Sequence, residues 1–280
     1  MSQPNEPEAV ALSAAAVSSG TGSFATSSTR GDVYRALALP LALVVAWELS
    51  TRYGLVNTRL LVPPTLVAQR ALSELREGAL LSQLVASLAR DLGGAALGSL
   101  FGVLVGSVMG VSRLGERLLG PSFHAAKQVA IFAWIPLMSV WLGTGETAKV
   151  VFIALAAFYP VAVNTFEGIR SVSPAHVEVA KVFRYTPLQV FRRVVLPAAA
   201  PSIFTGVKVG LVYAWLGTIG AEYLLAAAPG IGNLMIDGRE SFQMDKVLLG
   251  VIVVGAVGFA ISAAASALEA KILGWRALRA

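Results

Sequence analysis

Long apolar segments, repeated along the chain, limit what this sequence can fold into more than any other feature. Each is close to the roughly 20 residues with which an α-helix crosses the hydrocarbon core of a bilayer. Six such segments are predicted, at residues 36–53, 92–111, 123–142, 148–163, 198–223 and 247–272. The sequence therefore predicts an all-α protein that crosses a membrane six times.

The composition supports a membrane protein. Of the 280 residues, 56% are hydrophobic and 14% are charged, whereas about a quarter of the residues in a soluble domain carry charge. The net charge of +6 does not indicate nucleic acid, because the cations cluster in loops between spans and near the C-terminus. The absence of cysteine excludes disulfides and cysteine-based metal or thiol chemistry.

The chain divides into a short tail and one membrane domain. Residues 1–33 are rich in Ser, Ala and Gly with few aromatic residues, which predicts a disordered tail. The tail lacks a basic region followed by an apolar core, so it is not a standard signal peptide. Residues 34–280 are predicted to form the membrane domain.

Positive charge predicts the orientation in the membrane. The loop between the fourth and fifth spans holds five cations: Arg170, Lys181, Arg184, Arg192 and Arg193. Positively charged loops stay in the cytoplasm, and an even number of spans then puts both termini there too. Four arginines in the first outer loop run against this rule, but the later loops agree with it.

The same loop, at about residues 170–197, is patterned like an ordered element. Val179, Phe183 and Val190 recur at helical spacing, with an interruption at Pro187. A short amphipathic helix on the cytoplasmic face is a candidate for docking a partner. A helix that lies on the lipid headgroups is the alternative interpretation.

The loop contains Glu178-Val179-Ala180, followed by Val194-x-Leu196-Pro197. In this pattern it resembles the "EAA" loop of ATP-binding-cassette (ABC) importer permeases. This chain has Val179 where the family has its first Ala, and Arg184 where the family has Gly. In that family the loop is a coupling helix that fits a groove on the ATPase subunit. The resemblance implies seven coupling residues: Glu178, Val179, Ala180, Phe183, Arg184, Leu196 and Pro197.

Further motifs, from about Leu60 to Trp275, resemble the nitrate/sulfonate/taurine branch of these permeases. They are Leu61-Val62-Pro63-Pro64, Trp134-Ile135-Pro136-Leu137, Trp141-Leu142-Gly143-x-Gly145-Glu146-Thr147-x-Lys149, Glu167-Gly168-Ile169-Arg170-Ser171-Val172 and Gly230-Ile231-Gly232. The resemblance implies a six-span type I importer core in a bacterial inner membrane. It also implies a small sulfonate or taurine as solute, with nitrate or another oxyanion as the alternative.

The same resemblance implies partners. Two copies of the chain would form the pathway, two ATPase subunits would bind ATP and Mg, and a periplasmic binding protein would deliver the solute. No Lys follows a Gly in the sequence, so this chain lacks the P-loop ending that would bind ATP itself. We therefore expect no cofactor in this chain.

The sequence favours a transport subunit over an enzyme. His124 and His176 are too far apart to suggest a local metal motif, and no catalytic set of side chains can be recognised. The rival of another class is an ATP-independent carrier or channel. It would not need a docking helix, and carriers often show two related halves, which this sequence does not show.

Polar and aromatic residues within the spans are candidates for the translocation pathway. Lys208 lies inside the fifth span, where a charge is costly; it either attracts an anionic solute or pairs with a carboxylate. Pro136 is expected to kink or interrupt the third span. The six candidates are Trp134, Pro136, Lys208, Tyr213, Trp215 and Glu222, of which Glu222 is favoured for a structural or gating role.

The second span carries a glycine at every fourth position. These glycines are Gly94, Gly98, Gly102, Gly106 and Gly110. In a helix they form one groove without side chains, which lets another backbone approach closely within a bilayer. We expect a role in helix packing rather than in chemistry.

Overall fold

The computed structural model describes residues 30–58, 60–225 and 229–272. The chain separates into two units, Met1–Ser50 and Thr51–Ala280. The described part of the first unit belongs to helix α2, Arg30–Arg52, which begins within the predicted tail at residues 1–33. The rest of that predicted tail lies outside the described residues.

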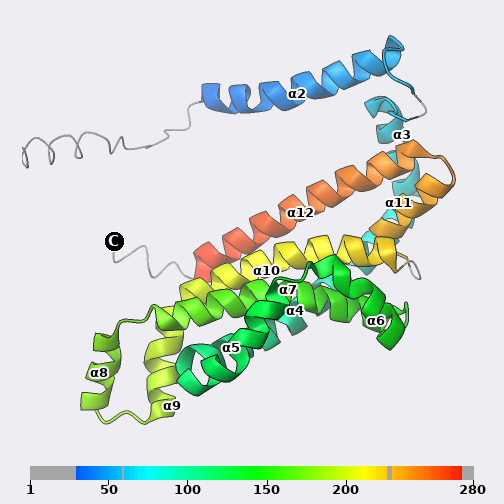
Figure 1. The fold of residues 1–280 in the computed structure, drawn as a ribbon. Coiled ribbons are helices and arrows are strands. Elements are labelled where there is room, and N and C mark those ends of the chain that lie inside the picture. Colours follow the sequence, from blue (N-terminus) through cyan, green and yellow to red (C-terminus); the bar gives the residue numbers. More distant parts are fainter. Residues whose placement is uncertain (1–29, 59, 226–228, 273–280) are drawn as a thin grey trace, which may run out of the picture. The chain divides into compact units, whose positions relative to one another are not determined.

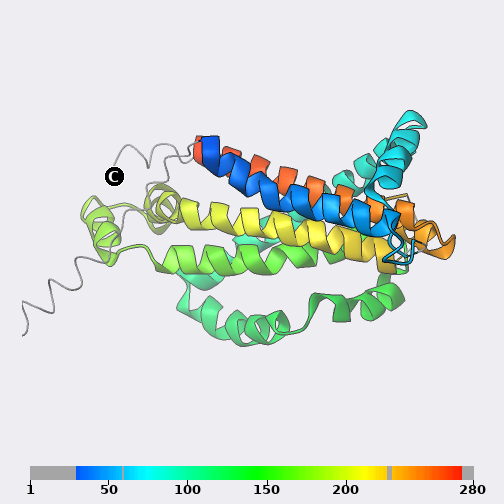
Figure 2. The same cartoon turned by 90° about the horizontal axis from the view of Figure 1, so that it is seen from above.

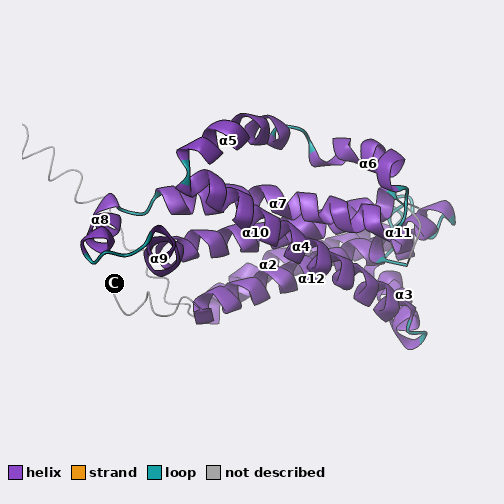
Figure 3. Cartoon of the chain, turned by 90° about the horizontal axis from the view of Figure 1, so that it is seen from below, coloured by secondary structure: helices purple, strands orange, loops and turns teal. Residues whose placement is uncertain are grey.

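The second unit consists of helices joined by short connections (Figures 1 and 3). They are α3 (Pro64–Arg76), α4 (Ala79–Val111), α5 (Arg113–Lys127), η1 (Ile131–Trp134), α6 (Ile135–Leu142), α7 (Glu146–Arg170), α8 (Pro174–Val182), α9 (Pro187–Val190), η2 (Phe191–Val195), α10 (Leu196–Leu224), α11 (Ile231–Glu240) and α12 (Met244–Ile272). No strand occurs in the described ranges, and the all-α prediction is confirmed.

Four helices are long and apolar enough to cross a membrane: Ala79–Val111, Glu146–Arg170, Pro187–Leu224 and Met244–Ile272. The pair Arg113–Lys127 and Ile131–Leu142, bent by 97° at the break between them, would make a fifth. Within the described residues, the six expected spans are thus four or five by length and composition. The protein is nevertheless a multi-pass membrane protein.

The segment at residues 123–142 is interrupted, as predicted, but the interruption does not lie at Pro136. α5 ends at Lys127, and η1 begins after a break at residues 128–130 (Figure 3). Pro136 does not cause the break, because it lies in the first turn of α6. A proline is well tolerated there, since the first turn of a helix has no hydrogen-bond acceptor for the missing N–H.

At the centre of the second unit, α7 packs against both α4 and α10, which also contact each other. The five glycines at every fourth position of the second span, from Gly94 to Gly110, all face α7. A Cβ atom on Gly94 would lie 2.5 Å from Ile153 Cγ2, and one on Gly106 would lie 2.5 Å from the Ala162 carbonyl oxygen. Neither distance is possible, so α4 and α7 are this close only because the side chains are missing.

Candidate functional site

The predicted coupling loop forms a helix–turn–helix at one end of the bundle. α8 and α9 project beyond the ends of α7 and α10 (Figures 1 and 2). A capping box starts α9: the Gln189 backbone N–H donates to Thr186 Oγ1, and the Thr186 backbone N–H donates to Gln189 Oε1 at 2.8 Å. Residues 171–195, from the end of α7 to the start of α10, are called the coupling segment below.

The coupling segment leaves apolar side chains uncovered. Val182 is 81% exposed and Phe183 is 70% exposed, whereas Ala180 is buried on the opposite face of α8. Glu178 and Arg184 lie exposed beside them. Exposed apolar residues rimmed by charges mark interaction surfaces, so this turn has the composition of a docking site.

Arg184 adopts the backbone conformation that a glycine would adopt more easily. Its φ is 56°, in the left-handed region. The Tyr185 N–H bonds to the Ala180 carbonyl at 3.1 Å, and the Arg184 N–H bonds to the Lys181 carbonyl at 2.9 Å. This pair of bonds is the Schellman closure, in which Gly usually occupies the left-handed position. The chain therefore keeps the turn of the family pattern without its Gly.

We expect Arg184→Gly to raise the free energy of unfolding by about 1 kcal/mol, because it relieves the left-handed strain at this position. Arg192→Gly is the matched control. Arg192 is also exposed but is helical, so its replacement should lower stability by about 1 kcal/mol. Thermal unfolding in detergent measures both. Two shifts of the same sign would contradict the assignment of strain to Arg184.

The other two predicted coupling residues lie apart from this turn. Leu196 and Pro197 begin α10, directly after the π-helical turn η2. They therefore connect the coupling segment to a membrane-spanning helix rather than lie on its exposed tip.

A network of charged side chains, buried except for Glu146, whose side chain is 53% exposed, lies at the opposite end of the bundle. Arg90 on α4 is at its centre. Its Nη1 donates to Glu222 Oε1 and to the Pro229 carbonyl, both at 2.7 Å, and its Nε donates to Glu146 Oε2 at 2.6 Å. Since these partners come from α7, α10 and the connection that precedes α11, one guanidinium joins three helices and this connection.

Glu222 receives further hydrogen bonds and is fully buried. The Ser87 hydroxyl lies 2.8 Å from Oε1, and the Gly232 N–H donates to Oε2 at 2.9 Å. A Cβ on Gly232 would lie 2.6 Å from the Glu222 Cβ. The Gly230-Ile231-Gly232 motif thus has a physical role, since it lets the Gly232 N–H reach a buried carboxylate, while the Ile231 N–H donates to Ser87 Oγ at 3.0 Å.

Two more ionisable side chains are buried, and both are close in the sequence to residues of this network. Lys149, three residues after Glu146, is fully buried, and among the described atoms its Nζ has no hydrogen-bond partner. Asp91, next to Arg90, is also fully buried and accepts a hydrogen bond from the Thr218 hydroxyl at 3.4 Å. Several ionisable side chains therefore lie inside the packed helices at the end of the bundle that holds the network.

The six pathway candidates do not come together. Glu222 belongs to the buried network. Trp215 is 2% exposed, and its indole N–H donates to the Val254 carbonyl of α12 at 3.0 Å. Lys208 pairs with Glu269 of α12 at 3.4 Å. These three side chains make contacts within the chain that account for their positions.

The remaining three candidates lie elsewhere. Trp134 packs against the buried cluster that contains Met138 and Phe152. Pro136 is exposed on α6. Tyr213 is 53% exposed and lines a cavity of about 400 Å³ between the end of α5, α7 and α10.

The cavity beside Tyr213 contains polar residues that the sequence reasoning missed. Lys127, Gln128 and Asn164 line it. The signal was available, because Lys127 is a cation within the apolar segment at residues 123–142, and a charge inside a span usually has a function.

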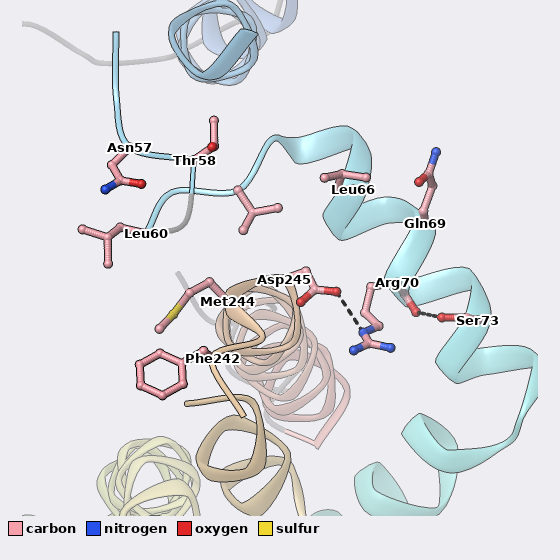
Figure 4. A pocket seen from close by; sticks show the side chains of 11 residues that line it. Asn57, Thr58, Leu60, Leu66, Gln69, Arg70, Ser73, Phe242, Met244 and Asp245 are labelled. Atoms are coloured by element: carbon pink, nitrogen blue, oxygen red, sulfur yellow. Dashed lines mark hydrogen bonds and ion pairs between the residues drawn. The ribbon is translucent and has the colours of Figure 1, made fainter. Parts of the chain in front are cut away.

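A wider groove, of about 1010 Å³, lies between α3 and the turn that joins α11 to α12 (Figure 4). Arg70 Nε pairs with Asp245 Oδ2 at 3.0 Å and holds the turn against α3. Phe242, at the tip of this turn, is 85% exposed and has a φ of 55°. The groove therefore has one fixed wall and one exposed aromatic side chain.

Comparison with known proteins identifies related sequences. A family model described as "Binding-protein-dependent transport system inner membrane component" matches residues 98–274. The putative aliphatic sulfonates transport permease protein SsuC of Bacillus subtilis is 35% identical over 86% of this chain and 87% of its own length. The taurine transport system permease protein TauC of Escherichia coli is 33% identical, with 85% and 87% covered.

Another relative is named for a different anion. The bicarbonate transport system permease protein CmpB of Synechocystis is 30% identical, with 82% of this chain and 85% of that protein covered. Solved structures share the fold. The MetNI methionine ABC transporter matches with a TM-score of 0.55 at 21% identity, over 69% of this chain and 98% of that chain. An amino acid ABC transporter matches with a TM-score of 0.57 at 18% identity, over 72% and 96%.

Proposed function

The chain belongs to the family of binding-protein-dependent transport system inner membrane components, and we propose that it is the permease of an ATP-driven importer for small aliphatic sulfonates. This membership confirms the family resemblance of the sequence. It makes the chain a transport subunit rather than an enzyme. The proposal concerns its solute, its partners and its orientation.

The uncovered apolar turn of the coupling segment is the observation that carries the ATP-driven mechanism. Val182 and Phe183 are largely exposed, and apolar side chains that form an exposed patch mark interaction sites. The turn that carries them is held by its own backbone hydrogen bonds. We propose that it docks on an ATPase subunit, which binds ATP and Mg. Two copies of the chain, two ATPase subunits and a periplasmic binding protein make up the importer.

The connections of the coupling segment suggest how movement is transmitted. α8 follows the end of α7 after three residues, and η2 continues directly into α10. A displacement of the docked turn is therefore passed to the two helices at the centre of the bundle. Closure of the ATPase subunits would shift the permease between inward-open and outward-open states, provided that ATP and solute bind the two states with different affinities.

This assignment sets the proposed orientation. The coupling segment lies in the cytoplasm, because the ATPase is there, and both termini lie on the same side. The buried network around Arg90 then lies at the outer end of the bundle, where the binding protein delivers solute.

The proposed solute rests on the relatives. Two are named for aliphatic sulfonates or taurine, at 35% and 33% identity. The second candidate, another small oxyanion such as bicarbonate or nitrate, is favoured by the relative named for bicarbonate. All these solutes carry an anionic oxygen group, so the two candidates predict the same kind of pathway.

We expect the pair of substitutions Glu178→Ala and Phe183→Ala to uncouple transport. The complex with its ATPase and binding protein is reconstituted in lipid nanodiscs, and ATP hydrolysis is measured with and without taurine. Loss of a docked aromatic side chain typically costs about 2 kcal/mol or more in binding. Solute-stimulated hydrolysis should therefore fall on the order of tenfold or more, with the fold intact.

Val140→Ala is the matched control, because Val140 is 81% exposed but lies on α6, away from the coupling segment. It should leave stimulation unchanged. If no ATPase associates with the intact chain, the importer assignment fails and an ATP-independent carrier takes its place. Stimulation by bicarbonate or nitrate but not by taurine would keep the mechanism and change the solute.

A further inference from the structure

The break between α5 and η1 places polar groups within the hydrocarbon core of the membrane. α5 has 15 residues, which at about 1.5 Å per residue span roughly 22 Å. This is less than the roughly 30 Å of a hydrocarbon core. A helix that starts at the membrane surface and has this length ends inside the core. The break at residues 128–130 therefore lies within the bilayer if the bent pair crosses it.

Non-helical backbone at that depth needs polar surroundings. The Gln128 and Val129 N–H groups bond to the Ala125 and Ala126 carbonyls at 3.2 Å, but no regular helix continues through the break. Irregular backbone is tolerated in a membrane where it is buried in protein or lines a water-filled cavity. The cavity of about 400 Å³ beside the break meets this condition, and its size is typical of sites for small molecules.

Several helices contribute polar groups to this cavity. Lys127 comes from the end of α5, Gln128 from the break, Tyr159 and Asn164 from α7, and Tyr213 from α10. Pro160 also lines the cavity. Because proline has no N–H, the α7 backbone carbonyl four residues before it lacks its usual helical partner. The cavity is thus polar on three of its sides.

Lys127 gives the cavity its charge. Among the described residues that line it, Lys127 is the single charged side chain. The side chain is exposed, and no described carboxylate forms an ion pair with it. In this respect it differs from Lys208, which pairs with Glu269. An uncompensated cation next to amide and hydroxyl groups favours an anion with oxygen atoms.

We propose that this cavity is an anion-binding site on the pathway, in which Lys127 binds the charged oxygen group of the solute. The proposal rests on the proposed function for the identity of the solute, and it assigns a specific side chain to anion selection. Gln128 and Tyr213 would contribute hydrogen-bond donors around the same group, together with the second N–H of the Asn164 amide, whose first N–H donates to the Pro160 carbonyl at 2.8 Å. The alternative role of Lys127 is to stabilise the C-terminus of α5 through the helix dipole.

The first test measures uptake by the complete complex in proteoliposomes, with taurine and ethanesulfonate as solutes. Lys127→Met should reduce the initial rate of uptake on the order of tenfold or more, because the positive charge that attracts the anionic solute is removed. Lys127→Arg keeps the charge and should retain most of the rate. Lys271→Met is the matched control, because Lys271 is an exposed cation in the last turn of α12, far along the chain from the cavity.

A second test does not depend on transport. It measures how the Lys127 charge changes the access of anionic and cationic reagents to the cavity. The chain contains no cysteine, so a Tyr213→Cys variant carries a single thiol that lines the cavity. Its labelling rates are compared for two methanethiosulfonate reagents, one ending in a sulfonate and one in a trimethylammonium group. Lys127→Met should lower the ratio of anionic to cationic labelling on the order of tenfold, whereas Lys271→Met should not.

The two tests separate the inference from the proposed function. Normal sulfonate uptake by Lys127→Met, with an unchanged labelling ratio, would overturn the anion site and leave the importer proposal intact. If the intact complex takes up neither sulfonate, the proposed solute is wrong, and the labelling ratio alone decides the anion site. Should Lys127→Met fail to assemble, Lys127→Gln in the same labelling assay gives the decision.

Discussion

Replacement of Glu222 by alanine is expected to lower the free energy of unfolding by about 3–5 kcal/mol, the range for breaking a buried ion pair. The carboxylate is fully buried and accepts hydrogen bonds from Ser87, Arg90 and the Gly232 N–H. Removing it leaves these donors without their acceptor. The Arg90 guanidinium keeps only Glu146 and the Pro229 carbonyl as partners.

The loss is measured as the shift in the unfolding transition of the detergent-solubilised complex. Glu222→Gln is the informative second variant, because it keeps the size and one acceptor oxygen but removes the charge. It should cost less than Glu222→Ala. Glu240→Ala is the matched control, since Glu240 is an exposed carboxylate on α11. Equal unfolding transitions for Glu222→Ala and Glu240→Ala would show that the network contributes no stability.

Replacement of Gly98 by leucine is expected to prevent the close packing of α4 against α7. A Cβ on Gly98 would collide with the backbone carbonyl of Ala154 and lie 2.8 Å from the Ala157 Cβ. Backbone atoms in the middle of a helix cannot rotate away as a long side chain can. The cost should therefore reach or exceed the roughly 1–3 kcal/mol that overpacking usually costs, and we expect aggregated or unassembled protein.

Gly93→Leu supplies a control on the same helix. Gly93 is exposed, and a Cβ there would meet nothing within 4 Å. Because leucine favours a helix more than glycine does, this variant should be as stable as the original chain or slightly more stable. Size-exclusion profiles and thermal unfolding compare the two. A Gly98→Leu protein that assembles and unfolds like Gly93→Leu would contradict the packing described for this seam.

The features that could be predicted from the sequence are those with a local pattern. A run of apolar residues predicts a span because length and hydropathy suffice. The four-residue spacing from Gly94 to Gly110 predicts a groove because a helix has 3.6 residues per turn. An ordered helical element at residues 171–195 was predictable because its motif lies within 20 residues, and the turn at Arg184 occurs where the motif has its Gly.

The features that could not be predicted depend on residues far apart in the chain. Arg90 and Glu222 are separated by 132 positions, and Arg90 and Glu146 by 56. No local pattern identifies such partners, so Glu222 could be assigned only to a general structural or gating role. The break after Lys127 was placed incorrectly at Pro136, because proline indicates a helix interruption as readily as a helix start.

The glycine stripe on α4 also limits which movements the transporter can use. The five glycines contact α7 at five successive turns of α4, and a different set of α7 atoms lies against each glycine. If α7 slid along α4 by a single residue, about 1.5 Å, other side chains would come against these glycines. Sliding of α7 along α4 is therefore blocked, whereas the two helices can still tilt together as one rigid pair. The hinges of the transport cycle must lie outside it, in connections such as residues 128–130 or η2.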